Sequence, residues 1–169
     1  MFRDRRSAEV TAPLHITEGG LDDPRVIELL DIHVTRALAE TGRGSGHALD
    51  LAALMRAPGL TFWSAWEDET RSTLVGIVAL NALSEELGEV KSMHIAERMR
   101  GRGYGSALVE HVIAVARARG MSRLSLETGS RPFFAPARAL YARHGFVACA
   151  PFGHYRPDPN SVFMTLHLR

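Results

Sequence analysis

Residues 98–106 read Arg-Met-Arg-Gly-Arg-Gly-Tyr-Gly-Ser, a glycine-rich loop that directly precedes an amphipathic segment. The glycines at 101, 103 and 105 allow the backbone to adopt positive φ and to approach a ligand closely. Across residues 103–119 apolar side chains recur at helical spacing, so the loop leads into a helix. The first N–H groups of a helix attract an anion, and the arginines at 98, 100 and 102 add positive charge. The segment therefore predicts a pyrophosphate-binding loop.

The spacing of these glycines excludes other phosphate loops. The dinucleotide fingerprint and the kinase loop both need Gly-x-Gly-x-x-Gly, whereas the glycines here recur at every second residue. The Walker loop needs a lysine after its last glycine, but the only lysine of the chain, Lys91, lies between Val90 and Ser92. The alternative to a phosphate loop is a plain strand-to-helix turn that is rich in glycine.

Hydrophobic patterning around the loop predicts one α+β domain, residues 13–169, after a flexible N-terminal segment, residues 1–12. The expected fold is a mixed, mostly antiparallel central sheet of about seven strands, flanked by about four helices. Strands are expected at residues 14–17, 60–67, 73–83, 88–95, 123–127, 146–150 and 162–168, and helices at 24–38, 49–56, 103–119 and 136–144.

Composition narrows the function. The chain has 169 residues, of which 46% are hydrophobic and 23% charged, as in an ordinary globular protein. A net charge of +1 without a long basic run argues against nucleic acid as a partner, and no apolar run is long enough to span a membrane. The single cysteine, Cys149, is expected to be a small buried residue; because it cannot form an intramolecular disulfide, a cytoplasmic location is expected. The eight histidines show no metal-binding spacing, so no metal is expected.

Two motifs together resemble those of one enzyme superfamily. The pattern Arg100-x-x-Gly103-x-Gly105 resembles the acyl-CoA loop of the GCN5-related N-acetyltransferase (GNAT) superfamily, and so does the strand before it. Residues 137–146, Ala-Arg-Ala-Leu-Tyr-Ala-Arg-His-Gly-Phe, are similar to the Ala-x-x-Leu-Tyr-x-x-x-Gly-Phe helix of that superfamily. The matched elements span residues 87–147, so the chain is identified as a bacterial single-domain member.

The resemblance implies how acetyl-CoA, the acyl donor, is held. The pantetheine arm would pair with the exposed backbone of the strand at Met93, His94 and Ile95. The pyrophosphate would lie on the loop made of Arg100, Gly101, Arg102, Gly103, Tyr104, Gly105 and Ser106. Many members carry an Asn that contacts the pantetheine at the position of Phe134, so that contact is absent or replaced here.

Two residues are expected to move protons. Tyr141 matches the tyrosine that protonates the leaving CoA thiolate in many members; the alternative is a packing tyrosine. Glu89 lies where many members carry a carboxylate that removes a proton from the amine, directly or through water. Glu89, Lys91, Met93 and Ile95 should alternate onto one strand face, so a structural ion pair between Glu89 and Lys91 is equally compatible. Glu127 is the reserve base.

The resemblance implies an N-acetyltransferase in which the primary amine of a small molecule attacks acetyl-CoA directly in a ternary complex. The alternatives are acetylation of a protein amine, or a non-catalytic acyl-CoA-binding or regulatory module on the same fold. The resemblance also allows a homodimer. The region around the acceptor would include His33, Arg36, Arg43 and His47, while Trp63 and Trp66 are expected in the core or at an interface.

Overall fold

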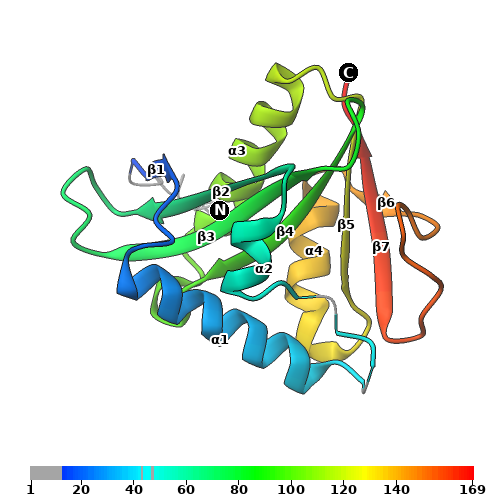
Figure 1. Cartoon of the computed structure of the whole chain (residues 1–169), viewed down its shortest axis with the longest axis horizontal. Coiled ribbons are helices and arrows are strands. Elements are labelled where there is room, and N and C mark those ends of the chain that lie inside the picture. Colours follow the sequence, from blue (N-terminus) through cyan, green and yellow to red (C-terminus); the bar gives the residue numbers. More distant parts are fainter. Residues whose placement is uncertain (1–12, 43, 47) are drawn as a thin grey trace, which may run out of the picture.

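The fold is a seven-stranded mixed sheet in the order β1-β2-β3-β4-β5-β7-β6, as seen in a computed structural model that describes residues 13–42, 44–46 and 48–169 (Figure 1). Neighbouring strands are antiparallel except β4 and β5, which are parallel. The strands are β1 (His15–Glu18), β2 (Leu60–Trp66), β3 (Leu74–Ala82), β4 (Leu87–Ile95), β5 (Arg123–Gly129), β6 (Val147–Ala148) and β7 (Ser161–His167). The α-helices are α1 (Pro24–Glu40), α2 (Leu51–Arg56), α3 (Tyr104–Ala118) and α4 (Ala135–Arg143), and two short 3₁₀ turns, η1 (Glu97–Met99) and η2 (Pro132–Phe134), precede α3 and α4.

Helices cover both faces of the sheet. In Figure 1, α1 and α2 lie in front of the strands and α3 and α4 lie behind them. The front core joins α1 and α2 to the sheet through residues such as Leu30, Leu54 and Ile77. The back core joins α3 and α4 to the sheet through residues such as Leu108 and Leu124. Strands β2 and β3 thus send side chains into both cores.

The α+β fold class and the strand order along the chain are as expected, with small differences at the C-terminal end. The edge strand β6 pairs over only two residues, so Cys149 is half-buried rather than buried. Trp63 and Trp66 both lie in the core. Residues 1–12, expected to be flexible, lie outside the described residues. No described helix is both long enough and apolar enough to cross a membrane.

The two central strands separate after a short parallel pairing. Residues Leu87, Gly88 and Glu89 of β4 pair with Arg123, Leu124 and Ser125 of β5. Beyond Glu89 no further pairing joins the two strands, although β4 runs on to Ile95 and β5 to Gly129. The β4 edge that faces β5 therefore offers unpaired N–H and C=O groups along a wedge-shaped opening.

A β-bulge at Ser92 changes the faces of β4. Lys91 pairs with Ala79 and His94 with Ile77, so two residues of β4, Ser92 and Met93, lie opposite a single residue of β3. Ser92 adopts φ 52°, which is rare for a residue with a side chain. Because one residue is inserted, the alternation of side chains is inverted beyond it.

Candidate active site

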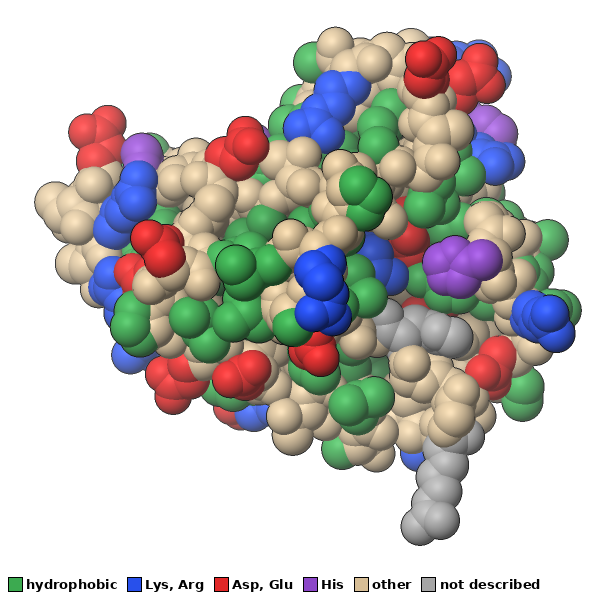
Figure 2. Space-filling model, in the orientation of Figure 1, with side chains coloured by type: hydrophobic (Ala, Val, Ile, Leu, Met, Phe, Trp, Pro, Cys, Tyr) green, Lys and Arg blue, Asp and Glu red, His purple; other side chains and the backbone are tan. Residues whose placement is uncertain are grey.

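A cavity of about 470 Å³ runs through the opening between β4 and β5. Its walls come from α1, β4, the glycine loop, the end of β5, η2 and α4. Figure 2 shows the face of the molecule that carries α1 and α2. Right of centre, basic and acidic side chains lie together in a hollow of this face. Of the twelve candidate site residues, eleven line the cavity: Glu89, Met93, His94, Ile95, Arg100, Gly101, Gly103, Tyr104, Gly105, Ser106 and Tyr141. Only Arg102 does not.

The glycine loop has the conformation that its sequence indicates. Gly101 and Gly103 adopt φ 73° and φ 83°, and Gly103 is the residue that precedes the first turn of α3. At Gly105 a Cβ atom would lie 3.0 Å from the Leu140 Cδ2 atom, so glycine allows α3 and α4 to pack closely. The N–H groups of the first turn of α3 have no partner within the helix and open onto the cavity. This end of the cavity can bind an anion through main-chain groups.

The arginines of this loop have different surroundings. Arg100 donates from Nε to the Ile95 carbonyl oxygen, 3.2 Å away, and its Nη2 atom lies 3.5 Å from His94 Nε2. Arg102 points away from the cavity toward Glu67, with 4.0 Å between Nη1 and Oε1. Arg98 is exposed. Of the three, Arg100 is thus the one that the structure places on the cavity wall.

Tyr141 belongs to α4, and its side chain reaches toward β4 on the back side of the opening. Its side chain is 8% exposed, and its hydroxyl group lies 3.5 Å from the Met93 sulfur. Burial raises the pKa of Tyr141 above its usual value, so the hydroxyl group keeps its proton at neutral pH. Tyr141 can therefore donate a proton to a group bound beside Met93.

Glu89 forms a buried network on the front side. It is 1% exposed, and its Oε1 atom accepts a hydrogen bond from Lys91 Nζ, 3.1 Å away, and another from the Tyr155 hydroxyl group. Lys91 Nζ also donates to the Tyr155 oxygen, 2.9 Å away. Burial, followed by the nearby Glu89 carboxylate, raises the pKa of Tyr155. The ion pair that the sequence allowed is therefore present, and it holds Glu89 in one place.

The expectation that Glu89, Lys91, Met93 and Ile95 share one face is wrong, because of the bulge at Ser92. Lys91 pairs with Ala79 of the front core and Glu89 lies two residues before it on the same face, whereas Ile95 and Met93 pack on the back core. His94 takes the place on the front face that Met93 was expected to share with Lys91. The candidate base and the candidate acid thus approach the opening from opposite faces of the sheet.

Two histidines meet on the front side of the cavity. His33 of α1 and His94 of β4 have their Nδ1 atoms 3.2 Å apart and their rings edge to face. Burial, and then the charge of Lys91, lower the pKa of His33 to about 4. Burial, and then His33 and nearby arginines, lower the pKa of His94 to about 3. Both rings are neutral at physiological pH.

The end of β5 and the turn before α4 complete the cavity. Glu127, the reserve base, lines the cavity and accepts a hydrogen bond from the Ser161 hydroxyl group, 2.9 Å away. Phe134, which replaces the expected Asn, also lines it and packs against Gly129, where any side chain would collide with the ring. An apolar contact therefore stands where many family members have a polar one, as the sequence indicates.

Sequence reasoning missed two parts of this site. Tyr155 lies in the segment between β6 and β7, 66 residues from Glu89 along the chain, and no motif marks it. The His33–His94 pair joins residues 61 positions apart, and only the place of His33 near the expected acceptor region pointed to it. Of the other residues expected there, Arg36 lines the cavity, while Arg43 and His47 lie outside the described residues.

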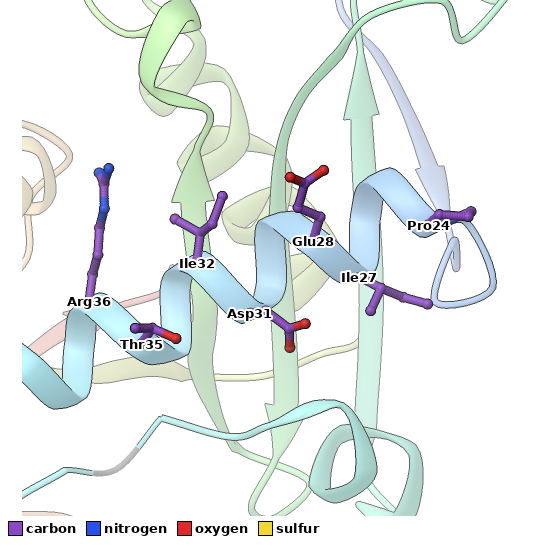
Figure 3. Close-up of a pocket in the computed structure, with 7 residues that line it drawn as sticks. All are labelled: Pro24, Ile27, Glu28, Asp31, Ile32, Thr35 and Arg36. Atoms are coloured by element: carbon purple, nitrogen blue, oxygen red, sulfur yellow. The ribbon is translucent and has the colours of Figure 1, made fainter.

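A second, open depression runs along the outer side of α1 (Figure 3). Its volume is about 610 Å³, and it is lined by side chains that point away from the sheet, such as Asp31 and Thr35. None of the candidate catalytic residues borders it. In the described part of the chain, no three His, Cys, Asp or Glu side chains are arranged to hold a metal ion.

Comparisons with known proteins agree with this geometry. A model of the acetyltransferase (GNAT) family matches residues 27–146. The chain is 43% identical to "Uncharacterized N-acetyltransferase YedL" of Escherichia coli (strain K12), over 88% of this chain and 91% of that protein. It is also 43% identical to "Uncharacterized N-acetyltransferase YsnE" of Bacillus subtilis (strain 168), over 92% of this chain and all of that protein.

Solved structures share the fold. A Klebsiella pneumoniae protein described as an acyl-CoA N-acyltransferase has a TM-score of 0.73 and 30% identity, over 94% of this chain and 99% of that one. A GNAT acetyltransferase from Elizabethkingia anophelis, solved with acetyl-CoA bound, has a TM-score of 0.64 and 17% identity, over 92% of this chain and 98% of that one. The family model and the two relatives together show that the chain belongs, as a bacterial member, to the GNAT family and is an acetyl-CoA-dependent acyltransferase.

Proposed function

We propose that this enzyme transfers an acetyl group from acetyl-CoA to the primary amine of a small molecule, by direct attack in a ternary complex. The observation that carries the proposal is the cavity through the opened sheet, which has main-chain donors at one end and buried ionisable side chains on its front wall. A cavity of about 470 Å³ that must also hold the acyl end of the donor leaves room for a small acceptor.

The donor would enter from the back side of the sheet. The first turn of α3 and the positive-φ glycines offer N–H groups to the pyrophosphate, and the unpaired edge of β4 offers N–H and C=O groups to the amide chain of pantetheine. In this arrangement the thioester reaches the opening beside Met93 and Tyr141.

The acceptor amine would reach the thioester from the front side. An alkylammonium must lose a proton before it attacks, and Glu89, directly or through a water molecule, is the proposed base. The nitrogen then attacks the carbonyl carbon, the carbon–sulfur bond breaks, and Tyr141 gives its proton to the leaving thiolate. The proton that the nitrogen still carries leaves as the amide forms and returns through solvent to the Tyr141 oxygen. Main-chain N–H groups near Ile95 would polarise the thioester oxygen. Holding both reactants in one cavity supplies much of the rate.

A thiol-release assay tests this function. The full chain is mixed with acetyl-CoA and with amino acids, small amines, or peptides that carry a free N-terminus or a lysine, and free CoA thiol is measured over time. Release with small amines supports the proposal, and release with peptides alone would shift the acceptor to a protein amine. Binding of CoA without release in any arm would indicate a non-catalytic binding or regulatory module.

We also propose that the reaction takes place in the cytoplasm. The single cysteine of the chain is compatible with a reducing compartment, and acetyl-CoA is the acyl donor that the family uses. A homodimer is a further proposal on the same family resemblance, and sedimentation of the full chain tests it.

A further inference from the structure

One corner of the cavity, on the front side of the sheet, has more hydrogen-bond donors than acceptors. It is formed by His33 of α1 and by Lys91 and His94 of β4, all of which line the cavity. His33 and Lys91 are close enough for the lysine charge to act on the ring of His33. The positions of the protons in this corner follow from the contacts of each group.

Arg100 determines which nitrogen of His94 carries the proton. A guanidinium group only donates hydrogen bonds, so His94 Nε2, 3.5 Å from Arg100 Nη2, is the acceptor. A neutral His94 then has its proton on Nδ1 and donates it to His33 Nδ1, 3.2 Å away. His33, also neutral, must therefore carry its own proton on Nε2. The contacts that run from Arg100 through His94 to α1 therefore leave His33 Nε2 as an N–H donor.

Lys91 provides the second donor. Its ammonium group has three protons, and the Glu89 carboxylate and the Tyr155 oxygen accept two of them. Within the described ranges, no protein group accepts the third proton of Lys91 or the Nε2 proton of His33. Two donors on the same wall, one of them charged, thus face the cavity without a hydrogen-bond acceptor of their own in those ranges.

The charges around this corner sum to a positive value. Lys91, Arg100 and Arg36 are the basic groups, and Glu89 and Glu97 are the acidic groups paired with Lys91 and Arg36. The opposite wall, on β5, carries the carboxylate of Glu127, which is hydrogen-bonded to Ser161. The carboxylate of Glu127 therefore lies across the cavity from the basic groups of this corner.

We propose that His33 and Lys91 bind a carboxylate group of the acceptor, so that the acceptor is a small molecule with both an amine and a carboxylate, such as an amino acid. The two oxygens of a carboxylate match two donors on the same wall, and a charged partner makes such hydrogen bonds stronger. The carboxylate of Glu127 suits the amine end of the same molecule. This inference rests on the proposed function, because it names the acceptor of the same reaction.

Matched compounds test the role of the carboxylate. The thiol-release assay compares each amino acid with its amide and with its decarboxylated amine, for example alanine, alaninamide and ethylamine. We expect kcat/KM to be at least about 10-fold higher for the preferred amino acid than for its two partners. Equal or higher kcat/KM for the amide and the amine would overturn the inference while leaving the amine acetyltransferase intact.

Variants of His33 separate recognition from folding. We expect His33→Ala to raise KM for the preferred amino acid about 10-fold more than KM for its decarboxylated amine, with the Kd for CoA unchanged. His33→Gln keeps an N–H donor and should recover part of that loss. Thr35→Ala, on the outer side of the same helix (Figure 3), is the control and should change neither KM. Equal losses for both compounds in His33→Ala would contradict the assignment.

Calorimetry separates this inference from the proposed function. The CoA-loaded full chain is titrated with the same amino acids, amides and amines, so that binding is measured without turnover. Binding that needs the carboxylate, without thiol release, would support the inference and refute the proposed function. Absence of binding for every amino acid would refute the inference itself.

Discussion

The back and front walls of the cavity are built from different parts of the chain. The back wall, at the glycine loop and the edge of β4, offers mainly backbone groups held by a single continuous segment. The front wall offers the side chains of Glu89, Lys91, His33 and His94, which come from α1 and β4. Tyr155, in the segment before β7, does not line the cavity but contacts Glu89 and Lys91. A site built from backbone groups allows many different side chains but needs glycines at fixed positions. A site built from side chains needs residues that are distant in the sequence to lie close together. The front wall is therefore where members of one family can differ in acceptor.

The largest expected effect comes from removing the front carboxylate. Glu89→Gln should lower kcat for thiol release about 10³-fold, because the proposed base is lost. It should also lower the free energy of unfolding by about 3 kcal/mol, because Lys91 is left without its counter-ion. Stopped-flow thiol detection and urea denaturation measure the two changes.

A double variant separates these two roles of Glu89. In Glu89→Gln with Lys91→Met, the unpaired charge is gone, so most of the lost stability should return while kcat stays low. Recovery of kcat in the double variant would instead show that Glu89 acts only as a structural ion-pair partner.

The next effect concerns the proton donor of the back wall. Tyr141→Phe should reduce kcat about 10²-fold, since the hydroxyl group beside Met93 can no longer protonate the thiolate. The ring packing against Phe146 is retained, so stability and the Kd for CoA should stay the same. A rate that equals that of the unmodified enzyme, with CoA still bound, would leave Tyr141 as a packing residue.

A smaller effect tests whether the loop binds through its backbone. Gly101→Ala and Gly120→Ala both place a side chain at positive φ, 73° and 77°, with open space around it. Both should lower the free energy of unfolding by about 1 kcal/mol. Only Gly101 lines the cavity, so we expect the Kd for CoA to rise about 10-fold in Gly101→Ala alone. Equal Kd values for the two variants would contradict a backbone-built site.

The last prediction concerns how stability depends on pH through the two histidines of the front wall. His33 and His94 have pKa values lowered to about 4 and about 3, whereas an unfolded histidine titrates near 6.5. Between pH 6.5 and 4 the unfolded chain binds more protons, so stability is full above pH 6.5 and declines as the pH falls. Each histidine contributes up to about 1.4 kcal/mol per pH unit in that range. Denaturation of His33→Gln at pH 7, 6 and 5 should show a shallower decline than the unmodified chain, and an identical decline would count against the pair.

The sequence predicts those parts of the site whose residues lie close together along the chain. The fold class, the glycine loop and the position of Tyr141 follow from patterns within a few residues of one another. The bulge at Ser92 was missed, although the sequence carries a sign of it: Lys91 and Ser92 are two consecutive polar residues, and the apolar positions change from Val90 to Met93 and Ile95. Met93 and Ile95 were therefore wrongly assigned to the face of Glu89 and Lys91.

The contacts of the front wall were beyond the reach of a single sequence. Tyr155 meets Glu89, and His33 meets His94, only because three elements pack around β4. Spacing rules describe neighbours along one helix or strand, so they carry no information about such meetings. The charge of Lys91 did point to its pairing with Glu89, since a buried lysine needs a partner.

The inserted residue at Ser92 determines which side chains at the end of β4 face the front and which face the back of the sheet. Because of this residue, Glu89 and Lys91 lie on the front face, where we propose that the acceptor binds, and Met93 and Ile95 lie on the back face, where we propose that the donor binds. If the same residues paired with β3 as a regular strand, without the bulge, the end of β4 would turn by half a repeat, sending Met93 toward α1 and His94 toward α4. The order of side chains would hardly change, yet donor and acceptor would each meet the wrong partners.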